Sequence, residues 1–303
     1  MKILHYIGNE YPLGTPGRFT DLLKAFGDDG HENTILMQDV PILRAALERQ
    51  NIPYTLNNLS FLNAMFRMRF HKKILTKSAP NIVLRYNNNH DECLEIIEDL
   101  YDGPIRNVKD IYVPVVQPDA SIKKMDREET MTPESDTIIG VFCPESPSLD
   151  GLEILITSIC KQNNFTLWIA LDPALSETVQ SMAKQHSFEE NIRLFDVTIP
   201  RGAFYKGCDL IVVPKGGIDS DISYLEAMAL GAPAISCNTR HLDYAVDCDL
   251  EILSNVSAED LRKKILTLAD DEAMRTRLGE QQRQVFESNH SPAQGLQKIL
   301  THL

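Results

Sequence analysis

The sequence predicts an α/β protein with two doubly wound domains. Short apolar runs alternate with helical stretches, one long polar segment divides the chain, and 303 residues with 43% apolar content are enough for about two buried cores. Apolar runs of this kind, without polar alternation, are typical of strands covered on both faces. Such strands form parallel sheets with crossover helices, which is the doubly wound arrangement.

The expected strands precede and follow a polar segment over 117–136. They are 2–8, 32–38, 81–87 and 111–116 before it, and 137–143, 165–171, 191–197, 209–214 and 233–237 after it. We therefore expect an N-terminal domain over 1–120, a linker over 121–136, a C-terminal domain over 137–290 and a last helix over 291–303. Ser257 is expected to cap a helix that begins the strongly helical tail.

Composition excludes several classes of function. A net charge of −13 argues against nucleic-acid binding, because proteins that neutralise phosphates carry basic faces. The six cysteines form no CxxC pair and have no histidine at zinc-ligand spacing, so we expect core thiols and no metal. The opening MKILHYIG is too short for a signal peptide, and no apolar run reaches membrane-spanning length. These features favour a cytoplasmic protein, at most peripheral to the inner face of a membrane.

The turn after the first expected strand contains Gly14, Gly17 and Arg18, just before an expected helix. Glycines let backbone amides approach a phosphate closely, and an arginine adds bidentate contacts. Gly and Pro in such a loop also simply make the turn. The spacing alone leaves both interpretations open.

A second turn, after strand 209–214, contains Lys215, Gly216 and Gly217 and leads into the helix of SYLEAMALGAP. A helix N-terminus with exposed amides and a nearby cation suits a diphosphate, and Glu226 would accept hydrogen bonds from ribose hydroxyls. Alternatively, Ser223 and Glu226 have the S-x-x-E spacing of a capping box, which needs no ligand. Asp219-Ser-Asp221 matches a DxD metal motif, but aspartates before a helix are ordinary caps.

At these residues the sequence resembles a family. The stretch VTIPRGAFYKGCDLIVVPKGGIDSDISYLEAMALGAPAIS resembles the donor site of GT-B glycosyltransferases of retaining family 4 (glycosyl transferases group 1). LGTPGR and LLKAFGDDGHENTIL resemble the glycine loop and first turn of the same family, with a shortened N-terminal domain. The resemblance implies two Rossmann-like domains, a nucleotide-diphosphate sugar as donor, retention of configuration and no metal cofactor.

Position by position, the resemblance implies that Glu226 holds the donor ribose and that Gly216 and Gly217 form the turn before it. Ser223 is a further candidate donor-binding residue. It implies that Gly14, Gly17 and Arg18 close over the donor phosphates. The family's histidine falls near Tyr86, with His90 the closest substitute. These two residues are the candidate catalytic groups.

The chain departs from the family at three positions. The first glutamate of the usual pair falls on Ile218, and the two cations that neutralise the departing diphosphate fall on Val141 and Asp150. Lys215 is the expected substitute for one of them. We therefore expect a glycosyltransferase with an unidentified acceptor. The alternative is a degenerate, non-catalytic GT-B protein that recognises a glycan or serves as a scaffold. A third possibility is another two-domain enzyme, such as a sugar-nucleotide epimerase or a phosphorylase. The acidic and histidine residues that an epimerase would place across its cleft are not found in the sequence.

A basic segment over 49–90 contrasts with the acidic chain. It has no acidic residue and carries seven cations: Arg49, Arg67, Arg69, Lys72, Lys73, Lys77 and Arg85. Such asymmetry indicates an anionic partner: a lipid-phosphate acceptor, a membrane surface or the donor diphosphate itself. Phe61, Phe66 and Phe70 would insert into a membrane interface. A core helix with solvated lysines is the other interpretation.

Overall fold

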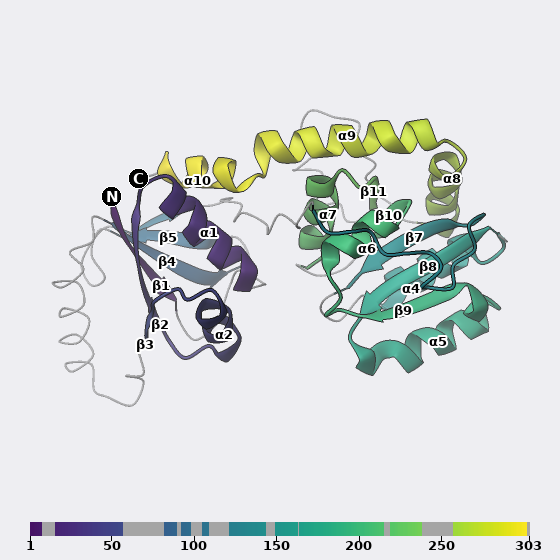
Figure 1. The fold of residues 1–303 in the computed structure, drawn as a ribbon, viewed down its shortest axis with the longest axis horizontal. Coiled ribbons are helices and arrows are strands. Elements are labelled where there is room, and N and C mark those ends of the chain that lie inside the picture. Colours follow the sequence, from purple (N-terminus) through teal and green to yellow (C-terminus); the bar gives the residue numbers. More distant parts are fainter. Residues whose placement is uncertain are drawn as a thin grey trace. The chain divides into compact units, whose positions relative to one another are not determined.

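The computed structural model describes residues 1–7, 16–56, 82–89, 92–97, 105–108, 121–143, 149–162, 164–214, 219–237 and 257–301. The chain divides into two compact units. The first contains Met1–Val116 and His290–Leu303, and the second contains Gln117–Asn289. Segment 121–136, the expected linker, thus lies within the second unit. Each unit has one sheet with helices packed against it (Figure 1).

The first unit is built on a six-stranded sheet in the order β3-β2-β1-β4-β5-β6. Its elements are β1 (Lys2–Ile7), α1 (Pro16–Asp28), β2 (Glu32–Met37), α2 (Pro41–Arg49), β3 (Thr55–Leu56), β4 (Ile82–Asn89), β5 (Glu92–Ile97), β6 (Ile105–Val108) and α10 (Pro292–Leu300). Phe19, Leu22 and Phe26 of α1 pack with Leu296 of α10 in one apolar core. The predicted strands in 2–8, 32–38 and 81–87 are confirmed.

Strands β5 and β6 of this sheet were not predicted from the sequence, and both pair in antiparallel register. β5 pairs with β4, and β6 with β5, in antiparallel register, whereas β1, β2, β3 and β4 pair in parallel. Only residues 90 and 91 join β4 to β5, and so short a connection permits a hairpin but no crossover helix. The expected strands 2–8, 32–38 and 81–87 pair in parallel as predicted, and β5 and β6 add an antiparallel edge that the sequence did not predict. The expected strand 111–116 lies outside the described residues.

The second unit has a fully parallel five-stranded sheet in the order β11-β10-β7-β8-β9. Its strands are β7 (Thr137–Phe142), β8 (Phe165–Leu171), β9 (Ile192–Asp196), β10 (Leu210–Val213) and β11 (Ala234–Ser236). Its helices are α4 (Leu149–Ile159), α5 (Ser176–Gln185), α6 (Arg201–Gly207), α7 (Asp219–Leu230), α8 (Ala258–Ala269) and α9 (Glu272–Asn289), with short 3₁₀ turns at Pro173–Leu175 and Glu189–Asn191. All five predicted strands are confirmed, as is the Ser257 cap, whose Oγ accepts from the Asp260 amide.

The two faces of this sheet bury different side chains, because successive residues of a strand point to opposite faces. Ile139 and Val141 of β7 belong to an aliphatic core that includes residues of α4, α5 and α8. Phe142 instead meets the rings of Phe204 and Tyr205 on α6. The α6 face is thus the aromatic one.

The amino edge of the same sheet is held by segment 121–136. Arg127 Nη2 donates to Asp209 Oδ2 at 2.7 Å, and Arg127 Nη1 donates to the carbonyl of Asp136 at 2.8 Å. Asp209 Oδ2 also accepts from the Ile138 amide at 2.8 Å, and Trp168 Nε1 donates to Thr132 Oγ1 at 3.0 Å. Arg127 thus attaches the segment to Asp209, directly before β10, and Thr132 attaches it to the middle of β8.

Candidate functional site

The candidate site is at the carboxyl edge of the second sheet, where ligands bind in open α/β sheets. Helix α7 follows β10 and begins at Asp219, four residues before the expected start at Ser223. Glu226 therefore lies seven residues into the helix, about 10 Å along its axis. The side chains of Asp219 and Asp221, the DxD candidates, are outside the described set.

The capping-box interpretation is wrong. Ser223 is inside the helix, and its Oγ donates to the Phe142 carbonyl at 2.9 Å, at the end of β7. A capping box would need the Ser223 hydroxyl to accept from a backbone amide three residues on. Ser223 instead joins α7 to the end of β7 while Glu226 turns toward α6.

The carboxylate of Glu226 is buried and held by two side chains of α6. Arg201 Nη1 donates to Glu226 Oε1 at 2.7 Å, and the Tyr205 hydroxyl donates to Oε2 at 3.1 Å. The Glu226 side chain is 2% exposed, whereas that of Arg201 is 27% exposed. Because Arg201 and Tyr205 are four residues apart on one helix, their side chains lie on the same face and reach the same carboxylate.

Two further contacts define the surroundings of this ion pair. The Arg201 guanidinium carbon lies 4.9 Å from the centroid of the Phe142 ring, which is a cation–π geometry. Burial, and then the charge of Glu226, raises the pKa of the Tyr205 phenol well above its usual value. The phenol therefore stays protonated and remains a donor to Glu226 at neutral pH.

Sequence reasoning missed Arg201, Tyr205 and Phe142. A signal was present: the RGAFY spacing places an arginine and a tyrosine four residues apart at the start of a helix. The spacing does not show which carboxylate they would meet, because Glu226 follows 21 residues after Tyr205 and belongs to another helix.

Neither Val141 nor Asp150 supplies the positive charge that the resemblance would place at these positions. Val141 is fully buried in the aliphatic core, on the opposite face of β7 from Phe142. Asp150 is exposed in the first turn of α4. Arg201, in contrast, brings a cation to Glu226.

Other predicted site residues are placed only in part. Gly17 and Arg18 lie in the first turn of α1, which begins at Pro16, rather than before the helix. Tyr86 lies on β4, in register with Ile7 of β1. The side chains of Arg18 and Tyr86 are outside the described set, as are the residues Gly14, His90, Lys215, Gly216, Gly217 and Ile218.

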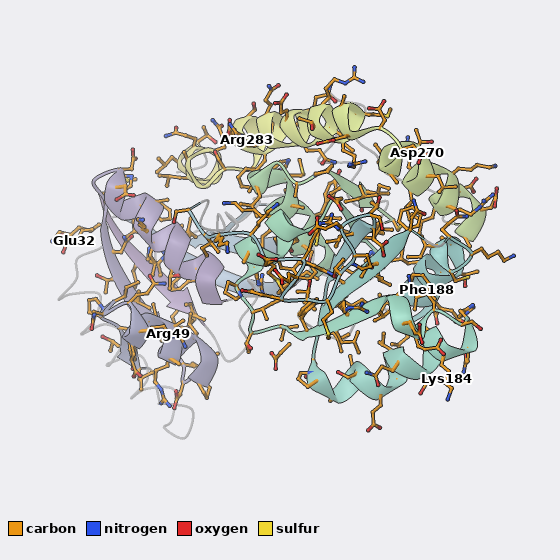
Figure 2. All side chains as sticks on the ribbon, turned by 45° about the vertical axis from the view of Figure 1, so that its right-hand side comes forward. Glu32, Arg49, Lys184, Phe188, Asp270 and Arg283 are labelled. Carbon is orange, nitrogen blue, oxygen red and sulfur yellow. The ribbon has the colours of Figure 1, made fainter. Side chains whose placement is uncertain are left out.

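Most of the basic segment also lies outside the described residues. Arg49 ends α2 and is exposed (Figure 2). None of the helices in the described part is both long and apolar enough to cross a membrane. Among the described side chains, no group of three or more His, Cys, Asp or Glu could hold a metal ion.

Comparisons with known proteins agree with this architecture. Residues 204–301 match a sequence family described as glycosyl transferase-like; the match begins within α6, after Arg201, and includes α7 and the helical tail. No curated protein matches the sequence.

Solved structures match over nearly the whole chain. A glycosyltransferase from Rickettsia africae ESF-5 has a TM-score of 0.75 at 14% identity, with 99% of this chain and 97% of that chain covered. Anabaena HepE, in complex with UDP and glucose, has a TM-score of 0.68 at 13% identity with both chains fully covered. The apo lipopolysaccharide outer core galactosyltransferase WaaB has a TM-score of 0.66 at 12% identity, again over both whole chains. The chain therefore has the two-domain, Rossmann-like fold of GT-B glycosyltransferases, and its residues 204–301 match a family described as glycosyl transferase-like.

Proposed function

We propose that the protein is a glycosyltransferase that takes its sugar from a nucleoside-diphosphate donor. The observation that carries the proposal is the carboxylate of Glu226, which is 2% exposed and held at the carboxyl edge of the second sheet. A carboxylate is an acceptor only, and each of its oxygens accepts more than one hydrogen bond. Glu226 thus suits the paired hydroxyls of a ribose.

The remaining donor contacts follow from the position of α7. The diphosphate would lie toward the N-terminus of this helix, where Lys215, Gly216 and Gly217 precede it in the sequence and the helix dipole favours anions. Ser223 would contribute only as a hydrogen-bond acceptor, because its hydroxyl already donates to the Phe142 carbonyl. Gly14, Gly17 and Arg18 would cover the phosphates.

The proposed reaction is transfer with retention and without a metal cofactor. The bond between the anomeric carbon and the diphosphate oxygen breaks, and an acceptor hydroxyl oxygen bonds to that carbon after losing its proton. Tyr86 and His90 are the candidate groups to accept this proton. UDP is the first probe for the donor, because HepE was solved with UDP.

Calorimetry with UDP, GDP and ADP sugars tests the proposal. We expect one base series to bind, and Glu226→Gln to weaken that binding. No binding across the panel, or equal binding by Glu226→Gln, would remove the donor assignment. The matched control is Glu259→Gln, which changes an exposed carboxylate on α8. Binding without transfer to any acceptor would favour the non-catalytic alternative, and transfer that survives EDTA would support the absence of a metal.

An anionic acceptor, such as a lipid phosphate at a membrane surface, is the second part of the proposal. Its support is the acid-free segment 49–90 with seven cations in a chain of net charge −13. Sedimentation with phosphatidylglycerol vesicles tests it, and phosphatidylcholine vesicles are the control. Equal recovery with both kinds of vesicle would remove the membrane part of the proposal.

A further inference from the structure

Helix α6 holds the two oxygens of Glu226 separately. Arg201 takes Oε1 at 2.7 Å and Tyr205 takes Oε2 at 3.1 Å. Two donors from one rigid helix therefore determine both the direction and the plane of the carboxylate. A ligand that hydrogen-bonds to Glu226 therefore meets a carboxylate whose orientation is already set.

Arg201 also places a positive charge beside the buried carboxylate of Glu226, with Nη1 at 2.7 Å from Oε1. A carboxylate with 2% exposure loses most of its hydration, which favours the protonated form unless a cation or hydrogen-bond donors compensate. Tyr205 is a neutral donor, so the charge compensation among these contacts comes from Arg201. A protonated Glu226 would be a poorer acceptor for two hydroxyls at once.

The Phe142 ring gives Arg201 a second support. The guanidinium carbon lies 4.9 Å from the ring centroid, and the hydroxyl of Ser223 donates to the carbonyl of the same Phe142 residue. The end of β7 is thus connected both to the cation and to the helix that carries the carboxylate. This connection keeps the guanidinium beside Glu226.

We propose that Arg201 is a positioning residue for Glu226 and, through it, determines a preference for ribonucleotide over deoxyribonucleotide donors. The inference rests on the proposed function, because it assumes that ribose binds at Glu226. Arg201 acts on the hydroxyls of the ligand through the carboxylate. If Arg201 were purely structural, its removal would weaken UDP and the dideoxy nucleotide equally. If it contacted the diphosphate directly, its removal would weaken both nucleotides but not uridine.

The test compares UDP with 2′,3′-dideoxyuridine diphosphate by calorimetry. In the original protein we expect UDP to bind more tightly, because only UDP has the hydroxyls. Arg201→Ala should reduce the ratio of the UDP affinity to the dideoxy affinity about tenfold, and Arg201→Lys should restore part of this ratio. In a Glu226→Gln background, Arg201→Ala should reduce the ratio no further. If Arg201→Ala does not fold, Arg201→Lys is compared with the original protein instead, and the ratio should fall by less than about tenfold.

Arg127→Ala is the matched control, because Arg127 and Asp209 form an ion pair of the same 2.7 Å length at the amino edge of the same sheet. It should lower stability and leave the ratio of the two affinities unchanged.

An unchanged ratio in Arg201→Ala would overturn the inference while leaving the proposed function standing. Equal loss of both nucleotides would assign Arg201 to structure, and a loss for UDP and its dideoxy form but not for uridine would assign it to the diphosphate. If the original protein binds UDP without preferring it to the dideoxy form, both the inference and the ribose role of Glu226 fail. If it binds no nucleoside diphosphate at all, the proposed function fails and the inference with it.

Discussion

Two ion pairs of the same length, Arg127–Asp209 and Arg201–Glu226, lie at opposite edges of the second sheet and have different roles. At the amino edge, Asp209 accepts from Arg127 and also from the main-chain amide of Ile138. At the carboxyl edge, Glu226 accepts from the side chains of Arg201 and Tyr205. The backbone amide of Ile138 ties Asp209 into the sheet, whereas the two side chains of α6 fix the orientation of the Glu226 carboxylate for a ligand. The same charge pair therefore suits structure at one edge and binding at the other.

The largest expected effect is on stability at the amino edge. Arg127→Ala should lower the free energy of unfolding of the second unit by about 3 kcal/mol, because it leaves the Asp209 carboxylate partly buried without its cation. Urea denaturation measures this change. Arg44→Ala, which removes an exposed pair with Asp39, should cost under about 1 kcal/mol. Similar small losses in both variants would contradict the structural role of the amino edge.

Next is the effect of Glu226→Gln on binding. The amide keeps the size of the side chain but replaces one acceptor oxygen with a donor, so UDP affinity should fall about a hundredfold. Asp209→Asn makes the same chemical change at the amino edge and should leave UDP affinity unaltered. Equal losses of UDP affinity in the two variants would show that binding is not confined to the carboxyl edge.

Ser223→Ala separates structure from binding within the carboxyl edge itself. Removing the buried hydrogen bond to the Phe142 carbonyl should lower the free energy of unfolding by about 1 kcal/mol. The preference for UDP over its dideoxy form should be retained, since Arg201 and Tyr205 still hold Glu226. A lost preference at unchanged stability would assign Ser223 to the ligand instead.

The smallest expected effect is that of Tyr205→Phe. It removes the neutral donor and keeps the cation, so the preference for UDP should fall about threefold. Because the pKa of Tyr205 is raised well above its usual value, this donor should persist as pH rises, and UDP affinity of the original protein should stay level up to about pH 9. Calorimetry across this range measures it, and a fall in affinity below pH 9 would indicate that another group controls binding.

The second unit was predictable because each of its strands is a continuous apolar run, and a strand buried on both faces must be such a run. The hairpin of β4 and β5 was not, since ECLEII carries two glutamates and does not show the apolar pattern. Ser223 illustrates a different difficulty. The S-x-x-E spacing is real, yet its hydroxyl bonds the Phe142 carbonyl 81 residues away, which no local pattern contains.

The candidate site was predictable as a place but not as an arrangement. The LEAMALGAP segment indicated the helix that carries Glu226, because strand-to-helix turns at the carboxyl edge bind ligands. The partners of Glu226 come from α6, which the intervening strand β10 separates from α7. Only the packing of α6 over β7 brings Arg201, Tyr205 and Phe142 together.

A crystal structure of the protein with UDP tests the central claim most directly. The account predicts that the ribose hydroxyls lie within hydrogen-bond distance of the Glu226 carboxylate, with Arg201 beside them and the diphosphate toward the N-terminus of α7. A nucleotide bound with its ribose away from Glu226, or bound at the amino edge near Arg127, would contradict it.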